Sequence, residues 1–484
     1  MTAGKTFEPN WESLTQYRCP DWFRNAKFGI WAHWGPQCVA QVGDWYARHM
    51  YIQGHAQYEH HVKAYGHPSK FGYKDIVQLW RAEKFDPEGL IELYRRVGAR
   101  YFVAMGVHHD NFDCWASRHH RWNAAQVGPK KDIVGLWRQA ALAAGLRFGV
   151  TEHLERSYSW FNTNKGADSE GPLAGVPYDG NDPEYEDFYF EAHQDTNAAY
   201  PVDPPEAWKQ QWLARLKDLI DQYQPDLLYT DGAVPFGRVG REMVAHLYNR
   251  SIECHDGELQ AVYTLKDARN FDLDHGEYVE GVGVLDLERG VVADIRPEPW
   301  QTDTCIGGWF YNRDAAYKSA QTVIHMLADI VSKNGNLLLN FPQRPDGTLD
   351  DEAHSIARGI GDWMAVNNEA IYDTRPWAVF GEGPTKFGEG NFAEREARDF
   401  TAEDFRFTTK GDALYAIALA WPDSGRLRVT SLAEGSQNAP EQISKVELLG
   451  SPAPVQWQRD QEGLHVTLPE DKPCESAFTL KVTA

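Results

Sequence analysis

Residues 225–235 read PDLLYTDGAVP, in which the mostly apolar residues 227–230 lead directly into Asp231 and Gly232. An Asp-Gly pair often only turns the chain, because glycine tolerates positive φ and aspartate hydrogen-bonds its own backbone. The other interpretation is a buried parallel strand that ends on Asp231, at the position where α/β barrels carry their chemistry. The surrounding segments are needed to choose between these two interpretations.

Short apolar runs recur along the first three quarters of the chain and alternate with helical patterns. There are eight such runs: 28–35, 101–109, 147–154, 226–232, 261–266, 283–289, 299–304 and 336–341. This alternation is typical of a parallel α/β sheet. We therefore expect a (β/α)8 barrel of the TIM type, degenerate where the fifth, sixth and seventh runs lie too close together for full crossover helices.

Two helices are predicted from apolar residues at three- and four-residue spacing. The first covers the stretch from Trp208 to Tyr223. The second takes Asp314 as its N-cap, continues to Val331 and ends near Gly335.

After about residue 370 the chain changes to short segments of alternating polar and apolar residues, such as ALYAIAL and LHVTLP, divided by Gly, Pro, Ser and Asp. That spacing is typical of an antiparallel β-sandwich. A chain of 484 residues is long enough for more than one domain. We expect a barrel domain over residues 1–370 and a β-sandwich domain over residues 371–484.

Composition excludes several classes of partner. The formal net charge of −22 opposes binding to nucleic acid, which requires a basic surface. No run is long and apolar enough to span a membrane, and the first residues lack the plan of a signal peptide. We expect a cytoplasmic protein as the chain stands, or an exported one if a leader was removed, with no nucleic-acid or membrane partner. No pattern predicts an oligomeric state.

Polar side chains stand at the ends of most of the predicted strands. The residues are His33, His108, His109, His153, Asp231, Glu288 and Arg289. The carboxyl ends of barrel strands converge on one face, so these side chains should line one pocket. Imidazole, carboxylate and guanidinium groups together suit a ligand with many hydroxyls. This convergence favours the catalytic interpretation of Asp231 over a simple turn.

Asp231 and Glu288 lie on different predicted strands, as the two carboxyl groups of a glycoside hydrolase do. In a retaining enzyme the two groups are about 5–5.5 Å apart, and in an inverting enzyme about 6.5–9.5 Å. The alternative for Glu288 is a local ion pair with Arg289.

The histidines also suggest a metal site, because residues 55–67 and 108–120 are dense in possible ligands. Neither stretch has two histidines on a helix with a nearby catalytic glutamate, and imidazoles donate equally well to sugar hydroxyls. We expect no metal and no cofactor, and keep a metal-dependent hydrolase as an alternative.

Several blocks of the sequence resemble the α-L-fucosidases of glycoside hydrolase family twenty-nine. They are WFRNAKFGIWAHWGP, GDWYARHMY, GHPSKFGYKD, VHHDNFDCW, LLYTDG and NGNLLLNFPQRPDG, in that order between residue 20 and about residue 370. The resemblance implies a degenerate barrel followed by a β-sandwich, and hydrolysis of terminal α-L-fucosides with retention. It implies that Asp231 is the nucleophile and that His33, Trp45, His108 and His109 contact fucose. Asp44, beside Trp45, and Trp309 are expected to contact the substrate as well.

One position departs from the family pattern. Many members carry the acid/base as a Glu in a WE…C…WGY block, whereas the matching stretch PWQTDTCIGGWFY has Gln301 there. An amide cannot donate a proton as a carboxylic acid does. We expect Glu288 to supply the proton, with three other glutamates as less favoured candidates: Glu152, Glu280 and Glu298.

The sequence thus predicts a retaining exo-glycosidase that releases terminal α-L-fucose from a fucosylated oligosaccharide or glycoconjugate. An α-L-galactosidase on the same site stays open, because an apolar pocket rejects one extra hydroxyl only about 10²-fold. An inactive fucose-binding protein also stays open, because Gln301 replaces the usual glutamate.

Overall fold

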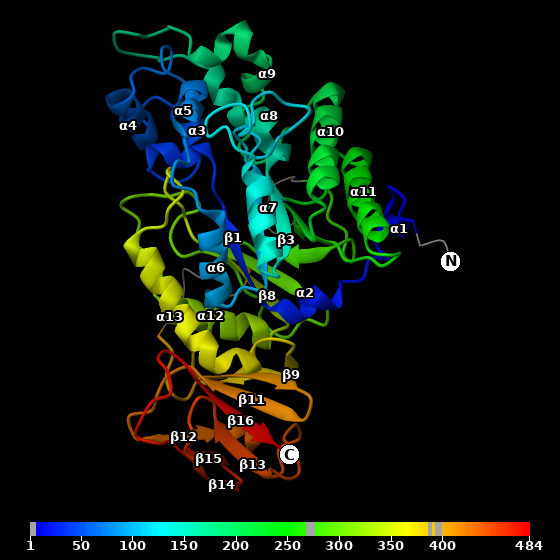
Figure 1. Ribbon diagram of the computed structural model, residues 1–484, viewed down its shortest axis with the longest axis vertical. Coiled ribbons are helices and arrows are strands. Elements are labelled where there is room, and N and C mark those ends of the chain that lie inside the picture. The colour runs from blue at the N-terminus through cyan, green and yellow to red at the C-terminus, as the bar shows by residue number, and fades with distance from the viewer. Residues whose placement is uncertain (1–5, 268–275, 386–389, 393–398) are drawn as a thin grey trace.

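The structure is a computed structural model that describes residues 6–267, 276–385, 390–392 and 399–484. Its first part is a closed barrel of eight parallel strands in sequence order, and its last part consists of two antiparallel sheets (Figure 1). This confirms the predicted fold class. The boundary at residue 370 stays a prediction. In the described ranges, no helix is both long enough and apolar enough to cross a membrane.

Each predicted run forms one barrel strand. The strands are β1 (Phe28–Ala32), β2 (Tyr101–Val107), β3 (Arg147–Glu152), β4 (Leu227–Thr230), β5 (Val262–Lys266), β6 (Val284–Asp286), β7 (Trp300–Cys305) and β8 (Gly335–Asn340). Strand β8 pairs with β1 and closes the barrel, with Leu338 opposite Gly29. Almost every strand residue is buried, because side chains face either the barrel interior or the surrounding helices.

Helices surround the barrel and cover its outer face. The main ones are α4 (Ala56–Ala64), α5 (Tyr73–Leu79), α6 (Pro87–Val97), α7 (Ile133–Ala143), α10 (Glu206–Tyr223), α11 (Arg238–Cys254), α12 (Ala320–Ser332) and α13 (Asp351–Asn367). Shorter helices are α1 (Trp11–Leu14), α2 (Asp21–Ala26), α3 (Tyr46–His49), α8 (Ser157–Trp160) and α9 (Glu186–Tyr189). No helix lies between β6 and β7 in the described residues 287–299, which confirms the predicted degeneracy there. The connection between β5 and β6 includes residues 268–275, which lie outside the described ranges.

The predicted start of α12 is wrong by five residues, because the N-cap is Ser319 and not Asp314. The helix begins at Ala320, after Ser319, whose hydroxyl accepts a hydrogen bond from the Thr322 amide. Tyr317 instead belongs to the preceding loop, where its hydroxyl donates to Asp350 at 2.9 Å. The helical spacing of apolar residues continued into a loop, and the sequence offered two good N-caps for one helix.

The C-terminal part forms a β-sandwich that packs on α12. One sheet has the order β13-β16-β11-β10-β9 and the other β12-β15-β14. The strands are β9 (Arg375–Glu382), β10 (Phe405–Lys410), β11 (Ala413–Ala418), β12 (Arg426–Val429), β13 (Lys445–Leu448), β14 (Gln456–Asp460), β15 (Gly463–Thr467) and β16 (Phe478–Thr483). In Figure 1, α12 and α13 lie between the barrel strands and this sandwich. Buried Arg406 of β10 donates to Asp329 of α12 at 2.6 Å, which joins the sandwich to the barrel.

Candidate active site

A cavity of about 660 Å³ opens at the carboxyl ends of the barrel strands. Every site residue predicted from the sequence lines it: His33, Asp44, Trp45, His108, His109, His153, Asp231, Glu288, Arg289 and Trp309. The lining also includes residues that the sequence analysis did not select: Trp31, Arg156, Asn197, Ala198, Ala199, Tyr229, Lys266, Asp303, Gly308 and Phe392. The barrel therefore brings residues that are far apart in sequence into one pocket, as its topology requires.

Asp231 follows the last residue of β4 and receives several hydrogen bonds and ion pairs. Its Oδ1 accepts from Lys266 Nζ at 2.6 Å and lies 3.2 Å from the Tyr229 hydroxyl. Its Oδ2 lies 3.2 Å from Arg156 and 3.3 Å from Nδ1 of His153. The Asp231 amide donates to the carbonyl of Glu152 in β3, which fixes the backbone after the strand ends.

These cations keep Asp231 ionised. Burial alone would raise the pKa of its carboxyl, but the charges of Arg156 and Lys266 outweigh burial and hold that pKa well below the ordinary value. A carboxylate that stays anionic near neutral pH can act as a nucleophile.

Lys266, the last residue of β5, bridges the two predicted catalytic carboxylates. Its Nζ lies 2.6 Å from Asp231 Oδ1 and 2.6 Å from Glu288 Oε2. The two oxygens are therefore separated by at most twice that distance. The Lys266 side chain is only 3% exposed, so water screens these contacts weakly.

Glu288 lies two residues beyond β6, which is shorter than the run from which it was predicted. Its Oε1 lies 3.3 Å from Nε1 of Trp309, and Oε2 accepts from Lys266. These contacts differ from the alternative expectation, in which Glu288 pairs with the adjacent Arg289. The Arg289 guanidinium instead stacks on the Trp309 ring at 5.0 Å and donates to the Gly307 carbonyl.

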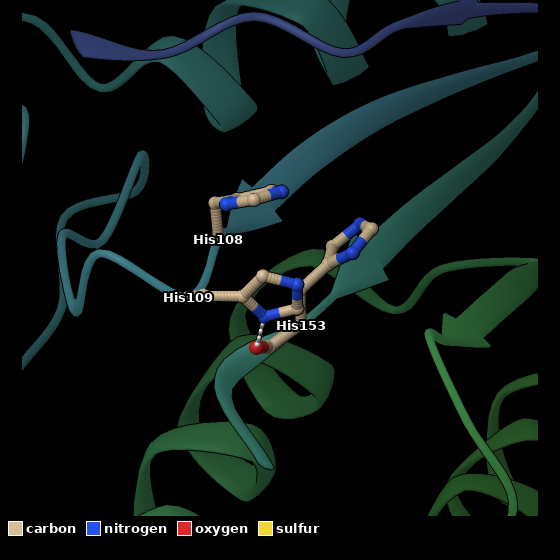
Figure 2. Close-up of side chains that lie close together, drawn as sticks. All are labelled: His108, His109 and His153. Carbon is tan, nitrogen blue, oxygen red and sulfur yellow. Dashed lines mark hydrogen bonds between the residues drawn. The ribbon is translucent and has the colours of Figure 1, made fainter. Parts of the chain in front are cut away.

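Three histidines from the ends of β2 and β3 gather on one side of the cavity, as Figure 2 shows: His108, His109 and His153. His109 Nδ1 donates to the carbonyl of His153 at 2.6 Å, which leaves Nε2 of the neutral ring as an acceptor. Burial lowers the pKa of His109 to about 3, so this ring is neutral near pH 7. His153 directs Nδ1 at Asp231 and places Nε2 3.2 Å from the hydroxyl of Thr151.

One nitrogen from each of these three rings lies within 4.8 Å of the others, a spacing that a metal ion could share. The hydrogen bonds of His108 favour another use. Gln37 accepts from the Ala47 amide through Oε1 and so donates to His108 Nδ1 through Nε2, at 2.8 Å. The neutral His108 ring then carries its proton on Nε2, where it is a donor for a hydroxyl and not a metal ligand.

His33 is buried, and neither of its ring nitrogens has a hydrogen-bond partner among the residues that the structure describes. A buried polar group without a partner is costly, and a ligand hydroxyl can supply the missing bond. Asp44 and His108 each place a polar atom within 4.8 Å of a His33 nitrogen. Trp45 stands edge-on to Trp160, with the ring centres 5.6 Å apart, and gives the cavity a flat apolar wall.

The other candidate acids do not line the cavity. Glu152 is buried and accepts from the Leu154 amide. Glu280 and Glu298 line a separate cavity of about 140 Å³. Gln301 is buried in β7, where it donates to Asp286 at 2.8 Å and accepts from the Tyr101 hydroxyl. Of the four glutamates considered for the acid, only Glu288 reaches the site.

Four residues that contact or adjoin Asp231 were missed: Arg156, Tyr229, Lys266 and Asp303. Lys266 stands at a strand end, so the rule that selected the other residues would have selected it. Asp303 lies within β7 and accepts from the Tyr229 hydroxyl at 3.0 Å. Burial raises the pKa of Asp303 to about 6.

An eight-stranded barrel whose cavity presents two carboxyl groups among histidines and tryptophans has the architecture of a glycoside hydrolase. Residues 1–369 match the family model for α-L-fucosidase, and residues 397–483 match the model for the α-L-fucosidase C-terminal domain. The chain belongs to the α-L-fucosidase family, glycoside hydrolase family twenty-nine, and its activity is α-L-fucoside hydrolysis.

Known relatives are similar along almost the whole chain. The tissue α-L-fucosidase of Homo sapiens is 28% identical over 99% of this chain and 92% of its own length. The plasma α-L-fucosidase of Homo sapiens is 29% identical over the same shares. The crystal structure of Thermotoga maritima α-fucosidase in complex with fucose has a TM-score of 0.71 and 25% identity, with 99% of this chain and 100% of that one covered.

Proposed function

We propose that this enzyme releases terminal α-L-fucose with retention, with Asp231 as the nucleophile and Glu288 as the acid/base. The observation that carries the proposal is the bridge through Lys266, which lies 2.6 Å from one oxygen of each carboxyl group. The resulting upper limit on the distance between these two oxygens is compatible with the spacing of about 5–5.5 Å in retaining enzymes.

In the first step an oxygen of Asp231 attacks the anomeric carbon while Glu288 protonates the leaving oxygen. The bond to the leaving group breaks and a covalent β-fucosyl ester forms. In the second step Glu288 takes a proton from water, which attacks the same carbon from the α face and releases fucose and Asp231. Once Asp231 is esterified it has lost its charge, so of these two carboxyl groups only Glu288 can still form an ion pair with Lys266.

The sugar would be held by the neutral histidines and the aromatic wall. His33 and His108 offer ring nitrogens to hydroxyls, and His109 offers an acceptor beside Asp231. The ring of Trp45 suits the apolar face and the C6 methyl of fucose.

Azide products test the nucleophile. With Asp231→Gly, azide can occupy the vacated volume and attack an activated α-fucosyl substrate directly, which gives the inverted β-fucosyl azide. Isolation of the α-azide from this variant would show that another group forms the covalent intermediate.

The acid/base needs a separate variant. With Glu288→Ala, an activated aryl fucoside still forms the ester, and azide then attacks from the α face to give the α-azide. Hydrolysis of fucosyl oligosaccharides should fall by about 10²-fold or more. Glu280→Ala is the matched control, because Glu280 pairs with Arg296 outside the cavity. Near wild-type cleavage of oligosaccharides by Glu288→Ala would exclude Glu288.

A further inference from the structure

A segment that follows β9 of the sandwich returns to the barrel and touches the loop that carries Glu288. The amide of Gly390 donates to the Val291 carbonyl at 2.8 Å, and the amide of Phe392 donates to the Glu288 carbonyl at 2.8 Å. Gly390 and Val291 form an antiparallel β-bridge. The backbone of Glu288 is therefore held by a residue more than one hundred positions away.

The two segments pack too closely for side chains at their crossing point. A Cβ atom on Gly290 would lie 2.1 Å from the Gly390 carbonyl oxygen, so this approach requires glycine. Phe392 itself has φ of 59°, a left-handed conformation that bulky residues seldom adopt. Backbone held in such a conformation is concentrated at binding and catalytic sites.

The Phe392 side chain lines the same cavity as Glu288 and Trp309. Its exposed fraction is 36%, which places it among the exposed large apolar residues of the described chain. The others in that group are Val62, Leu79, Leu142 and Val202, and none of them lines the cavity. A partly exposed aromatic ring in the lining of a cavity is a surface that a bound ligand can cover.

The position of Glu288 identifies which part of the ligand this surface meets. A general acid must lie within hydrogen-bond reach of the oxygen that it protonates, so the group attached to that oxygen passes beside Glu288. Residues 198 and 199 are alanines that also line the cavity, and Trp309 is hydrogen-bonded to Glu288 Oε1. Trp309 and Phe392 thus place two aromatic rings in the cavity that holds the acid.

We infer that Phe392, from the segment after β9, forms with Trp309 a binding surface for the leaving group, and that this surface takes groups with a flat apolar face. Aryl groups and the hydrogen-bearing face of a pyranose share this chemistry. The inference rests on the proposed function, because it takes Glu288 as the acid. It assigns to the C-terminal part of the chain a share in leaving-group selectivity.

The test compares three substrates that differ only in the leaving group: 4-nitrophenyl α-L-fucoside, a fucosylated disaccharide and α-L-fucosyl fluoride. Fluoride has no surface for the ring to contact. Phe392→Ala should lower kcat/KM about tenfold on the aryl fucoside or the disaccharide and leave kcat/KM on the fluoride within about twofold. A loss on the aryl substrate alone assigns the surface to aryl groups, and a loss on both extends it to sugars.

Two further variants serve as controls. Phe392→Trp keeps a flat ring and should retain the wild-type ratios, whereas Leu142→Ala removes an apolar side chain that is 43% exposed and does not line the cavity. Equal losses of kcat/KM on all three substrates would show that the segment only supports Glu288. An unchanged kcat/KM on all three would show that the ring contacts no part of the leaving group. Either result overturns the inference. The azide products test Glu288 separately, so the two proposals can fail independently.

Discussion

Replacing Lys266 by methionine removes the cation that bridges the two carboxyl groups, and its effect should appear in the pH profile. At 2.6 Å, two unit charges interact by about 1.6 kcal/mol even at the dielectric constant of water, about 80. That energy corresponds to roughly one pH unit. Because the side chains of Lys266 and Asp231 are only 3% and 13% exposed, this value is a lower bound.

The sign follows from the charge that is lost. Lys266 and Arg156 hold the pKa of Asp231 below its ordinary value, so removing Lys266 raises that pKa and moves the acidic limb of the profile to higher pH. The acidic limb of the Lys266→Met profile should therefore move to higher pH by at least about one unit.

The assay is kcat/KM against pH, which reports the groups of the free enzyme, on a fucosyl disaccharide whose leaving group needs protonation. Lys266→Arg is the control, because it keeps the charge and should leave the acidic limb near its wild-type position. If Lys266→Met lowers the rate while the acidic limb stays in place, the bridge is structural and the electrostatic reasoning is wrong.

Three further outcomes are expected. Each of His33→Ala, His108→Ala and His109→Ala should lower kcat/KM about 10²-fold with an unchanged unfolding midpoint, and wild-type kinetics in all three would contradict the pocket. Arg406→Leu should lower the free energy of unfolding in urea by about 1.5–3 kcal/mol, because buried Asp329 loses the hydrogen bond from Arg406 and keeps the one from Lys333; an unchanged midpoint would show that this contact stabilises little. Limited proteolysis between residues 370 and 400 should not release a soluble, fully active barrel, and such a release would refute the proposed docking of residues 371–484.

The barrel could be predicted because its strands are buried on both faces and so appear as continuous apolar runs. The LLYT of β4 and the LLL of β8 are examples. The start of α12 could not be predicted, since Asp314 and Ser319 are both good N-caps and the loop between them keeps a helical spacing. The bonds from Tyr317 to Asp350 and from the Lys318 amide to the Ile306 carbonyl hold the intervening residues in a loop.

The site residues that could be predicted from the sequence are mainly those that stand at strand ends. His33, His108, His153 and Asp231 each follow a barrel strand by one residue. Arg156 lies beyond β3 in a helical turn, and its approach to Asp231 depends on how that turn folds back. Phe392 lies outside the barrel segment altogether, and no local pattern links it to Glu288. Such contacts arise from packing between distant segments, which a local reading of the sequence does not resolve.

The last prediction concerns Gln301, at the position where many family members carry the acid. Its side chain is buried and bonded to Asp286 and Tyr101, and it does not line the cavity. A glutamate there would face another buried carboxyl group and would stay out of reach of the leaving oxygen. The double variant Glu288→Ala, Gln301→Glu should therefore cleave a fucosyl disaccharide no faster than Glu288→Ala alone, within about twofold.

The control for this comparison is Gln301→Glu in the wild-type background, which shows whether the buried exchange is tolerated by the fold. If that single variant is folded and the double variant recovers activity on the disaccharide, position 301 reaches the substrate. A glutamate on β7 or in the loop after β6 could then supply the proton equally well. The contact between Glu288 and Lys266 would not determine which residue acts as the acid.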